Sequence, residues 1–527
     1  MKKSLLLFAF TLLIYSAVLG IKTSNPDAQF ILPPLFKITN PLTYLSQLTA
    51  LQTIDFQPVR DLSFFVDLAI FRSSGIVTFA TINVLLFGFF AYLMMKLLAR
   101  ISPLSKLEMP FYWAMIFASH PLMSQSVGWG MARKHILAAM FAVWATLLFL
   151  EWKDGKKHWL YFFMAYIASV LSHPVAILWP CWALFHLWSS EIKFTKENKK
   201  IFAIVFSSAF LMFLINFTYY KIGNPVHASI YPRVESSFTD VKLILTNFSF
   251  DLTQIFYPFR LGFIYYPDFS VAWPGFVIAA LLAFAIFRRK DRQIYSWTIF
   301  GLMTIPMSVT LPGVYDTYLI LPFAGMIVIL FSLIDFHSQK TKIILAGMAI
   351  SLGIFTHFEN QKWKDDVAFN TRNFQKAKNC RSAINLVTAS YGKGHKISGE
   401  LMEYIKAESC FDTEIQYPVA SRRIFMFLYS LMMFYEEEEF DYQIRVDRLK
   451  SLGEGHFFPL IVYAALLARE DKAAEVEEQS RKALAILKGP SPMPAPFIDQ
   501  VLRPYCEKNN LPACLEITRI EPNPGYI

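Results

Sequence analysis

Long apolar stretches alternate with short polar ones over the first two thirds of the chain, and a polar block follows. A helix that crosses a bilayer needs about 20 mostly apolar residues. The predicted spans cover 75–98, 109–123, 134–151, 158–172, 175–189, 200–221, 271–287, 294–310, 317–335 and 343–358. An earlier apolar run, 4–21, is either a first span or a cleavable signal peptide, and we interpret it as an uncleaved helix.

Lysine and arginine are concentrated in alternate loops, and this bias predicts the orientation. The basic loops carry Lys96, Arg100 and Lys106; Lys153, Lys156 and Lys157; Lys193, Lys196, Lys199 and Lys200; Arg288, Arg289, Lys290 and Arg292; and Lys340 and Lys342. Because cytoplasmic loops are rich in lysine and arginine, these loops and the N-terminus are predicted to be cytoplasmic. About eleven spans would then leave the chain after residue 358 outside the cytosol.

Three polar regions complete the predicted layout. Residues 1–358 form the membrane domain, with a first large outside loop at 22–74 and a second at 222–272 that holds interfacial or re-entrant helix. Residues 359–527 form an extracytoplasmic helical domain. Helical periodicity between Tyr463 and Leu487 predicts a helix pair there, which Gly489-Pro490 ends. The fold class is therefore all-α, a polytopic membrane bundle with a helical tail.

Composition supports a membrane protein. Hydrophobic residues make up 55% of the chain, charged residues only 17%, and the mean hydropathy is +0.38, whereas soluble proteins carry about 25% charged residues. The net charge of +10 does not indicate nucleic acid, because the cations lie in loops beside lipid headgroups.

Cysteine usage fits an extracytoplasmic tail. Cys181 lies in an apolar stretch and is predicted to be buried, whereas four others lie in the polar part: Cys380, Cys410, Cys506 and Cys514. Outside the cytosol these four would form two disulfides with three alternative pairings, and in a reducing compartment they would stay thiols.

Cations in the predicted outside loops are exceptions to the orientation rule, so they are candidate ligands for an anion. They are Arg60, Arg133, Lys134 and Arg260. Guanidinium and ammonium groups bind phosphate well, and a lipid-linked phosphate would present its head group at this depth. The alternative is that these side chains reach lipid headgroups or pair with an aspartate.

Two carboxylates and one imidazole near the outer surface are further candidates. Asp27, just after the first span, could act as a general base or could be a turn residue after Pro26. Asp316 begins a span, where capping alone would explain it. His120 precedes a proline at a helix end, where a structural role is the simpler interpretation. No metal-binding motif is present, so a divalent metal has no support, and no cofactor is expected.

The loop that starts at His120 resembles a signature of the transmembrane and tetratricopeptide-repeat O-mannosyltransferases and their bacterial relatives, which share the C-type (GT-C) fold of membrane glycosyltransferases. That signature reads His-Pro-x-x-x-Glu-x-Val-x-Trp-x-x-x-Arg-x-Asp-x-Leu. The matching residues are His120, Pro121, Val127, Trp129, Arg133 and Leu137. Gln125 stands at the position of the glutamate and His135 at that of the aspartate.

Four shorter stretches follow the same family in order and spacing. They are Leu62-Ser63-Phe64 after Pro58, Phe79 to Asn83, Pro258 to Tyr265, and Asp316-Thr317-Tyr318 with Pro322 and Gly325. The resemblance covers roughly residues 1–360. The helix pair in the tail is similar to one of the family's helical repeats.

The resemblance implies sugar transfer from a polyprenyl-phosphate sugar to a protein or glycan acceptor outside the cytosol, at the inner membrane of a bacterium. Asp27 would be the base, and Arg133 and Lys134, with Arg60 and Arg260, would bind the phosphate. Two alternatives stay open. One is an inactive scaffold of the same fold whose tail binds a partner protein, favoured by the exchanged carboxylates. The other is a transporter of lipid-linked sugars, which would more often show internal repeats.

Overall fold

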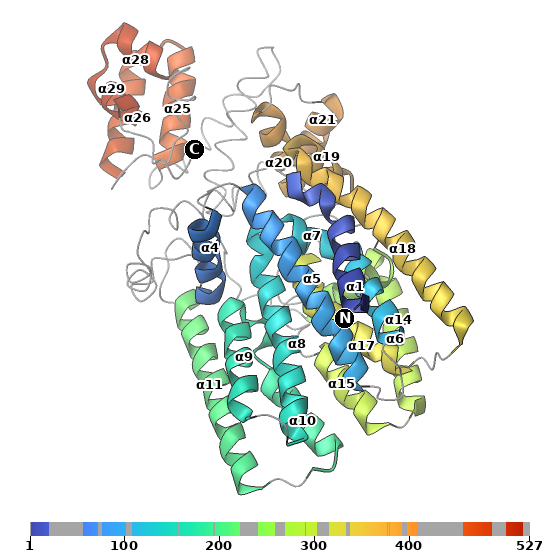
Figure 1. Cartoon of the computed structure of the whole chain (residues 1–527). Coiled ribbons are helices and arrows are strands. Elements are labelled where there is room, and N and C mark those ends of the chain that lie inside the picture. Colours follow the sequence, from blue (N-terminus) through green and yellow to red (C-terminus); the bar gives the residue numbers. More distant parts are fainter. Residues whose placement is uncertain are drawn as a thin grey trace. The chain divides into compact units, whose positions relative to one another are not determined.

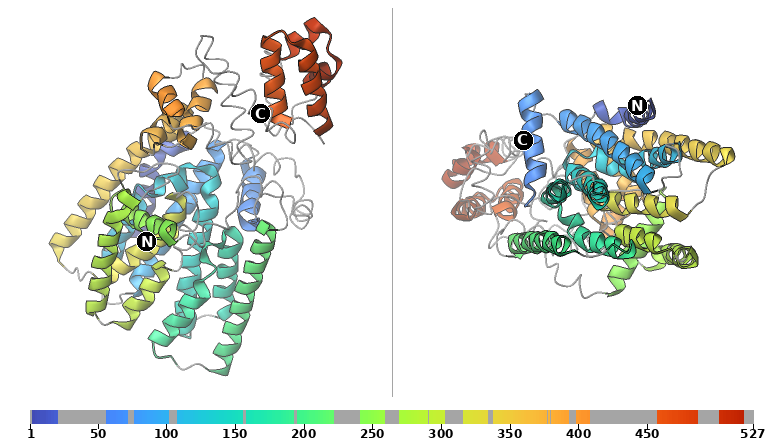
Figure 2. Two further views of the ribbon diagram at one scale, coloured as in Figure 1. Left: turned by 180° about the vertical axis from the view of Figure 1, so that it is seen from behind. Right: turned by 60° about the horizontal axis from the view of Figure 1, so that its bottom comes forward.

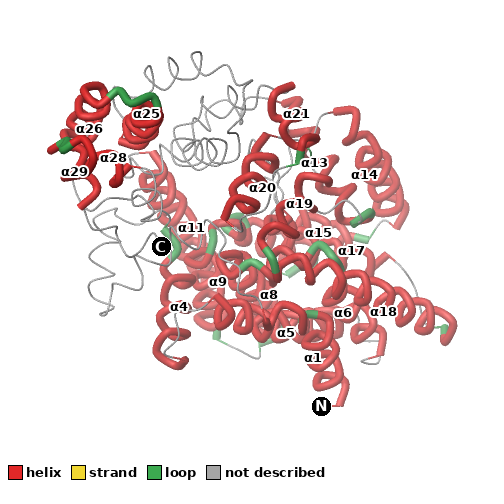
Figure 3. Tube along the Cα trace, turned by 90° about the horizontal axis from the view of Figure 1, so that it is seen from above, coloured by secondary structure: helices red, strands yellow, loops and turns green. Residues whose placement is uncertain are grey.

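The computed structural model describes residues 2–20, 56–71, 76–101, 108–155, 158–192, 195–221, 241–258, 269–289, 291–302, 316–333, 338–376, 378, 380–392, 398–407, 457–486 and 502–519. Every regular element in these ranges is a helix, as the trace in Figure 3 shows. Contacts divide the chain into two units. The first comprises 1–24, 45–227 and 233–378, and the second comprises 25–44, 228–232 and 379–527.

Six helical segments of the first unit are long and apolar enough to cross a membrane, which confirms a membrane-type fold. They are Phe79–Ile101, Gly130–Lys153, Lys196–Thr218, Ala272–Arg289, Asp316–Leu333 and Gln339–Lys364. The helices that form them (Figure 1) are α5 (Ile76–Ile101), α8 (Arg133–Lys153), α11 (Lys196–Lys221), α14 (Phe269–Arg289), α17 (Ile320–Leu333) and α18 (Gln339–Gln361). Each coincides with a span predicted from the sequence.

The other five predicted spans fall on helices that are shorter than a membrane crossing requires. The predicted number of eleven spans is therefore not confirmed. These helices are α1 (Lys2–Ile14) with η1 (Ser16–Gly20), α6 (Glu108–Ser119), α9 (Trp159–Ser172), α10 (Trp179–Ser189) and α15 (Arg292–Leu302). Prolines account for several of the breaks, because a proline cannot donate the backbone hydrogen bond that continues a helix. Pro121 follows α6, Pro174 follows α9, and Pro180 lies in the first turn of α10.

The six long segments form an inner and an outer set. The segments of α5, α8 and α17 are 61%, 67% and 78% buried within the protein, whereas those of α11, α14 and α18 are 22%, 17% and 22% buried. Leucine, isoleucine and phenylalanine side chains on the outer set are exposed. An apolar helix that protein does not cover is suited to lipid contact, so the outer three present the lipid-facing surface of this unit.

Basic residues at several helix ends form ion pairs at one end of the bundle. Glu108 at the start of α6 pairs with both Lys3 and Lys342, and Arg100 at the end of α5 pairs with Asp154 after α8. Figure 2 shows the same helices from behind and with the bottom of the view in Figure 1 turned forward. We call the end of the bundle with these ion pairs the basic end and the opposite end the polar end.

Two close backbone contacts fix neighbouring helices. A Cβ at Gly325 of α17 would overlap the Cα of Gly301 in α15. A Cβ at Gly275 of α14 would overlap the backbone carbonyl of Ser249 in α13 (Val241–Phe256). Helix α13 lies in the region where we predicted interfacial or re-entrant helix, and it buries polar side chains on its protein side.

One predicted core residue is not in the core. Cys181 is a free, exposed thiol, because it shares a face of α10 with exposed Leu184 and Trp188 while Trp182 and His186 face inward. The predicted domain boundary at 358 also falls inside a continuous element, since α18 runs on to Gln361.

In the described part of the second unit, α20 (Cys380–Gly392) and α21 (Gly399–Ala407) come first, and two further helix pairs follow. Helices α25 (Phe457–Arg469) and α26 (Ala473–Ile486) pack together at the predicted place, and α28 (Arg503–Asn509) and α29 (Pro512–Arg519) follow. Cys506 and Cys514 form a disulfide between α28 and α29, and Cys380 is also disulfide-bonded. The Glu477 carboxylate accepts the backbone N–H groups of Ala513 and Cys514, which caps α29.

Candidate functional site

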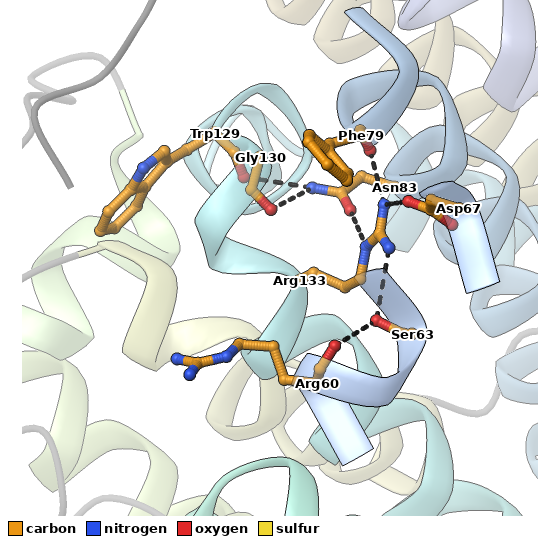
Figure 4. Close-up of polar contacts among 8 residues, drawn as sticks. All are labelled: Arg60, Ser63, Asp67, Phe79, Asn83, Trp129, Gly130 and Arg133. Atoms are coloured by element: carbon orange, nitrogen blue, oxygen red, sulfur yellow. Dashed lines mark hydrogen bonds and ion pairs between the residues drawn. The ribbon is translucent and has the colours of Figure 1, made fainter. Parts of the chain in front are cut away.

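At the polar end, one group of polar contacts is centred on Arg133. It begins α8 and is completely buried. Its Nε donates to Asn83 Oδ1 at 2.8 Å, its Nη1 to Ser63 Oγ at 3.3 Å and its Nη2 to the Phe79 carbonyl at 3.0 Å. Nη2 also lies 2.6 Å from Asp67 Oδ2. Figure 4 shows these groups converging on the guanidinium from α4 (Pro58–Phe71) and α5.

Aromatic rings complete the enclosure of this cation. The guanidinium carbon of Arg133 lies 4.6 Å from the ring centre of Phe64 and 5.7 Å from that of Phe79, distances at which cation–π attraction operates. Burial raises the pKa of Asp67, and the charge of Arg133 opposes that rise. The positive charge of Arg133 is therefore balanced inside the protein by one carboxylate, three oxygen acceptors and two rings.

The same network holds the turn that follows α7 (Met123–Gly128). Asn83 uses its oxygen for Arg133 and its Nδ2 to donate to the carbonyls of Trp129 and Gly130, at 3.1 and 3.3 Å. Both carbonyls belong to the chain just before α8. In Figure 4 the guanidinium of Arg60 and the indole of Trp129 point to the side away from the Arg133 guanidinium. Arg133 thus acts as a clasp between α4, α5 and this turn.

Arg60 lies in a second buried group. Its Nε donates to Asp61 at 2.6 Å and its Nη1 to Gln57 at 2.7 Å, and all three side chains are buried. These partners come from the first turn of α4 and the residue before it. The stretch from Pro58 to Phe64 therefore contributes Arg60 to this buried group and Ser63 to the contacts of Arg133.

The start of α17 joins the loop after α6 through a glutamine. The backbone N–H of Thr317, in η5 (Asp316–Leu319), donates to Gln125 Oε1 at 2.9 Å. Asp316 is buried and lies within electrostatic range of Lys362 at the end of α18. The side-chain amide oxygen of Gln125 accepts this backbone hydrogen bond as a neutral group.

Two histidines and a tyrosine from three elements meet beside Arg60. The ring centres of His135 and His173 are 4.6 Å apart, and that of Tyr318 lies 4.7 Å from His135 and 5.5 Å from His173. His135 and His173 are buried, and Tyr318 is partly exposed. We call His135, His173 and Tyr318 the imidazole cluster.

Sequence reasoning missed a polar contact between α7 and the end of α18. Ser124 donates its hydroxyl to Asn360 at 2.6 Å and accepts the indole N–H of Trp363 at 3.3 Å. Glu359 is buried between Lys362 and Arg372, and pairs with both. The only signal in the sequence was a pair of polar residues at the end of an apolar stretch, which also describes an ordinary membrane boundary.

Of the remaining predicted site residues, two are described by the structure and three are not. His120 is buried, and its ring centre lies 4.3 Å from that of Phe323. Lys134 is partly exposed on the first turn of α8. Asp27, Arg260 and Tyr265 lie outside the described residues, so their roles stay predictions.

No group of three metal-ligating side chains occurs among the described residues. Comparisons of the chain with models of known families, with curated proteins and with solved structures found no match.

Proposed function

We propose that this protein is a membrane glycosyltransferase that moves a sugar from a polyprenyl-phosphate donor to a protein or glycan acceptor on the outer face of the membrane. One observation carries the proposal: four separate stretches that resemble the GT-C family touch one another at the polar end. Arg133 contacts Ser63 and Asn83, and Gln125 contacts Thr317. A site built from these stretches would require them to meet in this way.

The proposed topology places the polar end outside the cytosol. In it, about eleven spans cross the inner membrane of a bacterium, the basic end faces the cytoplasm, and the second unit is a periplasmic domain of the tetratricopeptide-repeat type. Two observations support this arrangement. The basic helix ends pair with acidic groups at one end, and the tail carries disulfide-bonded cysteines, which persist in oxidising compartments.

The proposed reaction needs a base and a positive environment. Asp27 would remove the proton of the acceptor hydroxyl as its oxygen attacks the sugar carbon. The bond from that carbon to the donor's phosphate oxygen breaks, and the phosphate leaves with the electron pair. Arg60, Lys134 and Arg260 would stabilise the charge that develops on it, and such preorganised electrostatic stabilisation is usually the largest contribution to catalysis. No cofactor enters this scheme.

A second candidate function, a non-catalytic scaffold whose tail binds a partner protein, has its own support. The Arg133 guanidinium is occupied by protein groups, and two positions of the family signature hold Gln125 and His135 in place of carboxylates. These features suit a bundle that keeps the fold without the chemistry. Enzyme assays decide between the two.

The test is transfer of radiolabelled sugar from undecaprenyl-phosphate sugars by the purified protein in lipid nanodiscs. Asp27→Asn should lower the rate on the order of 10²–10⁴-fold while the protein still folds. Asp55→Asn, another aspartate of the same predicted loop, is the matched control. No transfer by the wild-type protein with any donor and acceptor tried would favour the scaffold. Full activity of Asp27→Asn would reject the assignment of the base.

A further inference from the structure

The imidazole cluster contains a buried nitrogen that the protein leaves unpaired. His135 is 1% exposed, and its Nδ1 has no hydrogen-bond partner in the described part of the chain. Most buried polar side-chain atoms in proteins have a partner, and an unpaired one costs about 1–3 kcal/mol. The unpaired nitrogen indicates a place for a group that is not part of this chain.

The surroundings of that nitrogen are electropositive. The charged and titratable groups that act on His135 are His173, Lys134 and Arg60. His135 also lies in the first turn of α8, whose preceding residue, Ala132, provides no side-chain cap. A helix N-terminus carries a partial positive charge and favours anions. Asp61 pairs with Arg60 at 2.6 Å and offsets part of its charge.

The edge of the cluster is partly exposed. Tyr318 and Lys134 are both partly exposed, whereas the Arg133 guanidinium is fully enclosed. A ligand that approaches Tyr318 would meet a phenolic O–H, two imidazole rings and an ammonium group. All of these groups can donate hydrogen bonds to an oxyanion.

We propose that His135, His173 and Tyr318 bind the phosphate of the lipid-linked substrate, with Lys134 and Arg60 supplying positive charge, and that Arg133 is a positioning residue. The identity of the lipid rests on the proposed function, whereas the phosphate chemistry rests on the cluster itself. In this arrangement His135 does not merely replace the carboxylate of the family signature. It changes that position from one that repels phosphate to one that donates a hydrogen bond to it.

The test is equilibrium binding of ³²P-labelled undecaprenyl phosphate to the full-length protein in phosphatidylcholine nanodiscs. His135→Gln removes the imidazole and should weaken binding about tenfold or more, the loss expected for one hydrogen bond to a charged group. Tyr318→Phe removes one hydroxyl from a partly exposed side chain, so it should fold normally and weaken binding several-fold. His186→Gln is the matched control, because His186 is likewise a buried histidine with one unpaired ring nitrogen, but its Nδ1 is bonded to Ser296 at 3.0 Å and its ring packs against Trp182 and Trp297.

Competition identifies the ligand. Unlabelled undecaprenyl phosphate and, more weakly, inorganic phosphate should displace the label, whereas undecaprenol should not. Wild-type affinity in both His135→Gln and Tyr318→Phe would overturn the proposal, as would an equal loss in His186→Gln. Equal displacement by phosphatidylglycerol would overturn the assignment to a lipid-linked substrate.

The binding measurement and the sugar-transfer assay test the two proposals separately. If the cluster variants lose binding but the wild-type protein transfers no sugar, the phosphate site stands and the glycosyltransferase is rejected. If the wild-type protein and His135→Gln transfer sugar equally well, the enzyme stands and this site is rejected.

Discussion

The ion pair between Asp67 and Arg133 makes a strong prediction about stability. Its two charged atoms are 2.6 Å apart, and the side chains are 4% and 0% exposed. Asp67→Asn keeps the size of the side chain and an oxygen acceptor but removes the negative charge. Because a guanidinium is not deprotonated in proteins, Arg133 would remain a buried cation without a counter-charge.

The expected cost follows from the burial of the pair. Removing one partner of a buried ion pair costs about 3–5 kcal/mol. Asn83, Ser63 and the Phe79 carbonyl would still accept hydrogen bonds from Arg133, so we expect the lower end, about 3 kcal/mol.

The assay is the free energy of unfolding in mixed micelles, measured by titration with sodium dodecyl sulfate and followed by tryptophan fluorescence. Glu191→Gln is the control, since Glu191 and Arg292 form an ion pair with side chains that are 76% and 60% exposed; exposed pairs contribute little, and the control should unfold like the wild-type protein. An Asp67→Asn protein whose unfolding free energy stays within about 1 kcal/mol of the wild type would refute the clasp.

Three further predictions concern other parts of the chain. Gly325→Ala should lower the thermal unfolding temperature, because its Cβ would overlap Gly301, whereas Gly347→Ala, with nothing within 4 Å, should not; equal melting of the two variants would contradict the packing of α15 on α17. Cys506→Ser should remove the cross-link to Cys514 and cost the second unit about 2–3 kcal/mol, and a non-reducing peptide map in which these two cysteines are not joined would be the contrary result. Protease added to the outside of spheroplasts should digest the second unit, and protection until the membrane is opened would reverse the proposed orientation.

Much of the helical framework follows from the sequence. Six predicted spans coincide with long apolar helices, because an apolar run long enough to cross a bilayer is rare in proteins that stay in water. The shorter helices were less predictable. Prolines follow the ends of α6 and α9, whereas Pro274 lies inside the continuous helix α14, so the sequence alone does not show where a proline stops a helix.

The candidate site was predictable in place but not in role. The sequence singled out Arg133 as an exception to the charge bias, and it lies at the polar end as expected. Its partners, Asp67 and Asn83, are 66 and 50 residues away in the sequence, so the clasp could not be derived from spacing. The contact between His173 and His135, which are 38 residues apart in the sequence, could not be derived from spacing either.

Helix α13 has a consequence for how the protein is made. Its buried side includes Asn247, Ser249 and Asp251, whereas Val241 and Leu245 are exposed. Polar side chains of this kind are costly next to lipid unless other protein covers them. The helix that covers Ser249 is α14, whose Gly275 meets it only after further translation. We therefore expect the insertion machinery to hold α13 until α14 has left the ribosome and to release both into the bilayer as one hairpin.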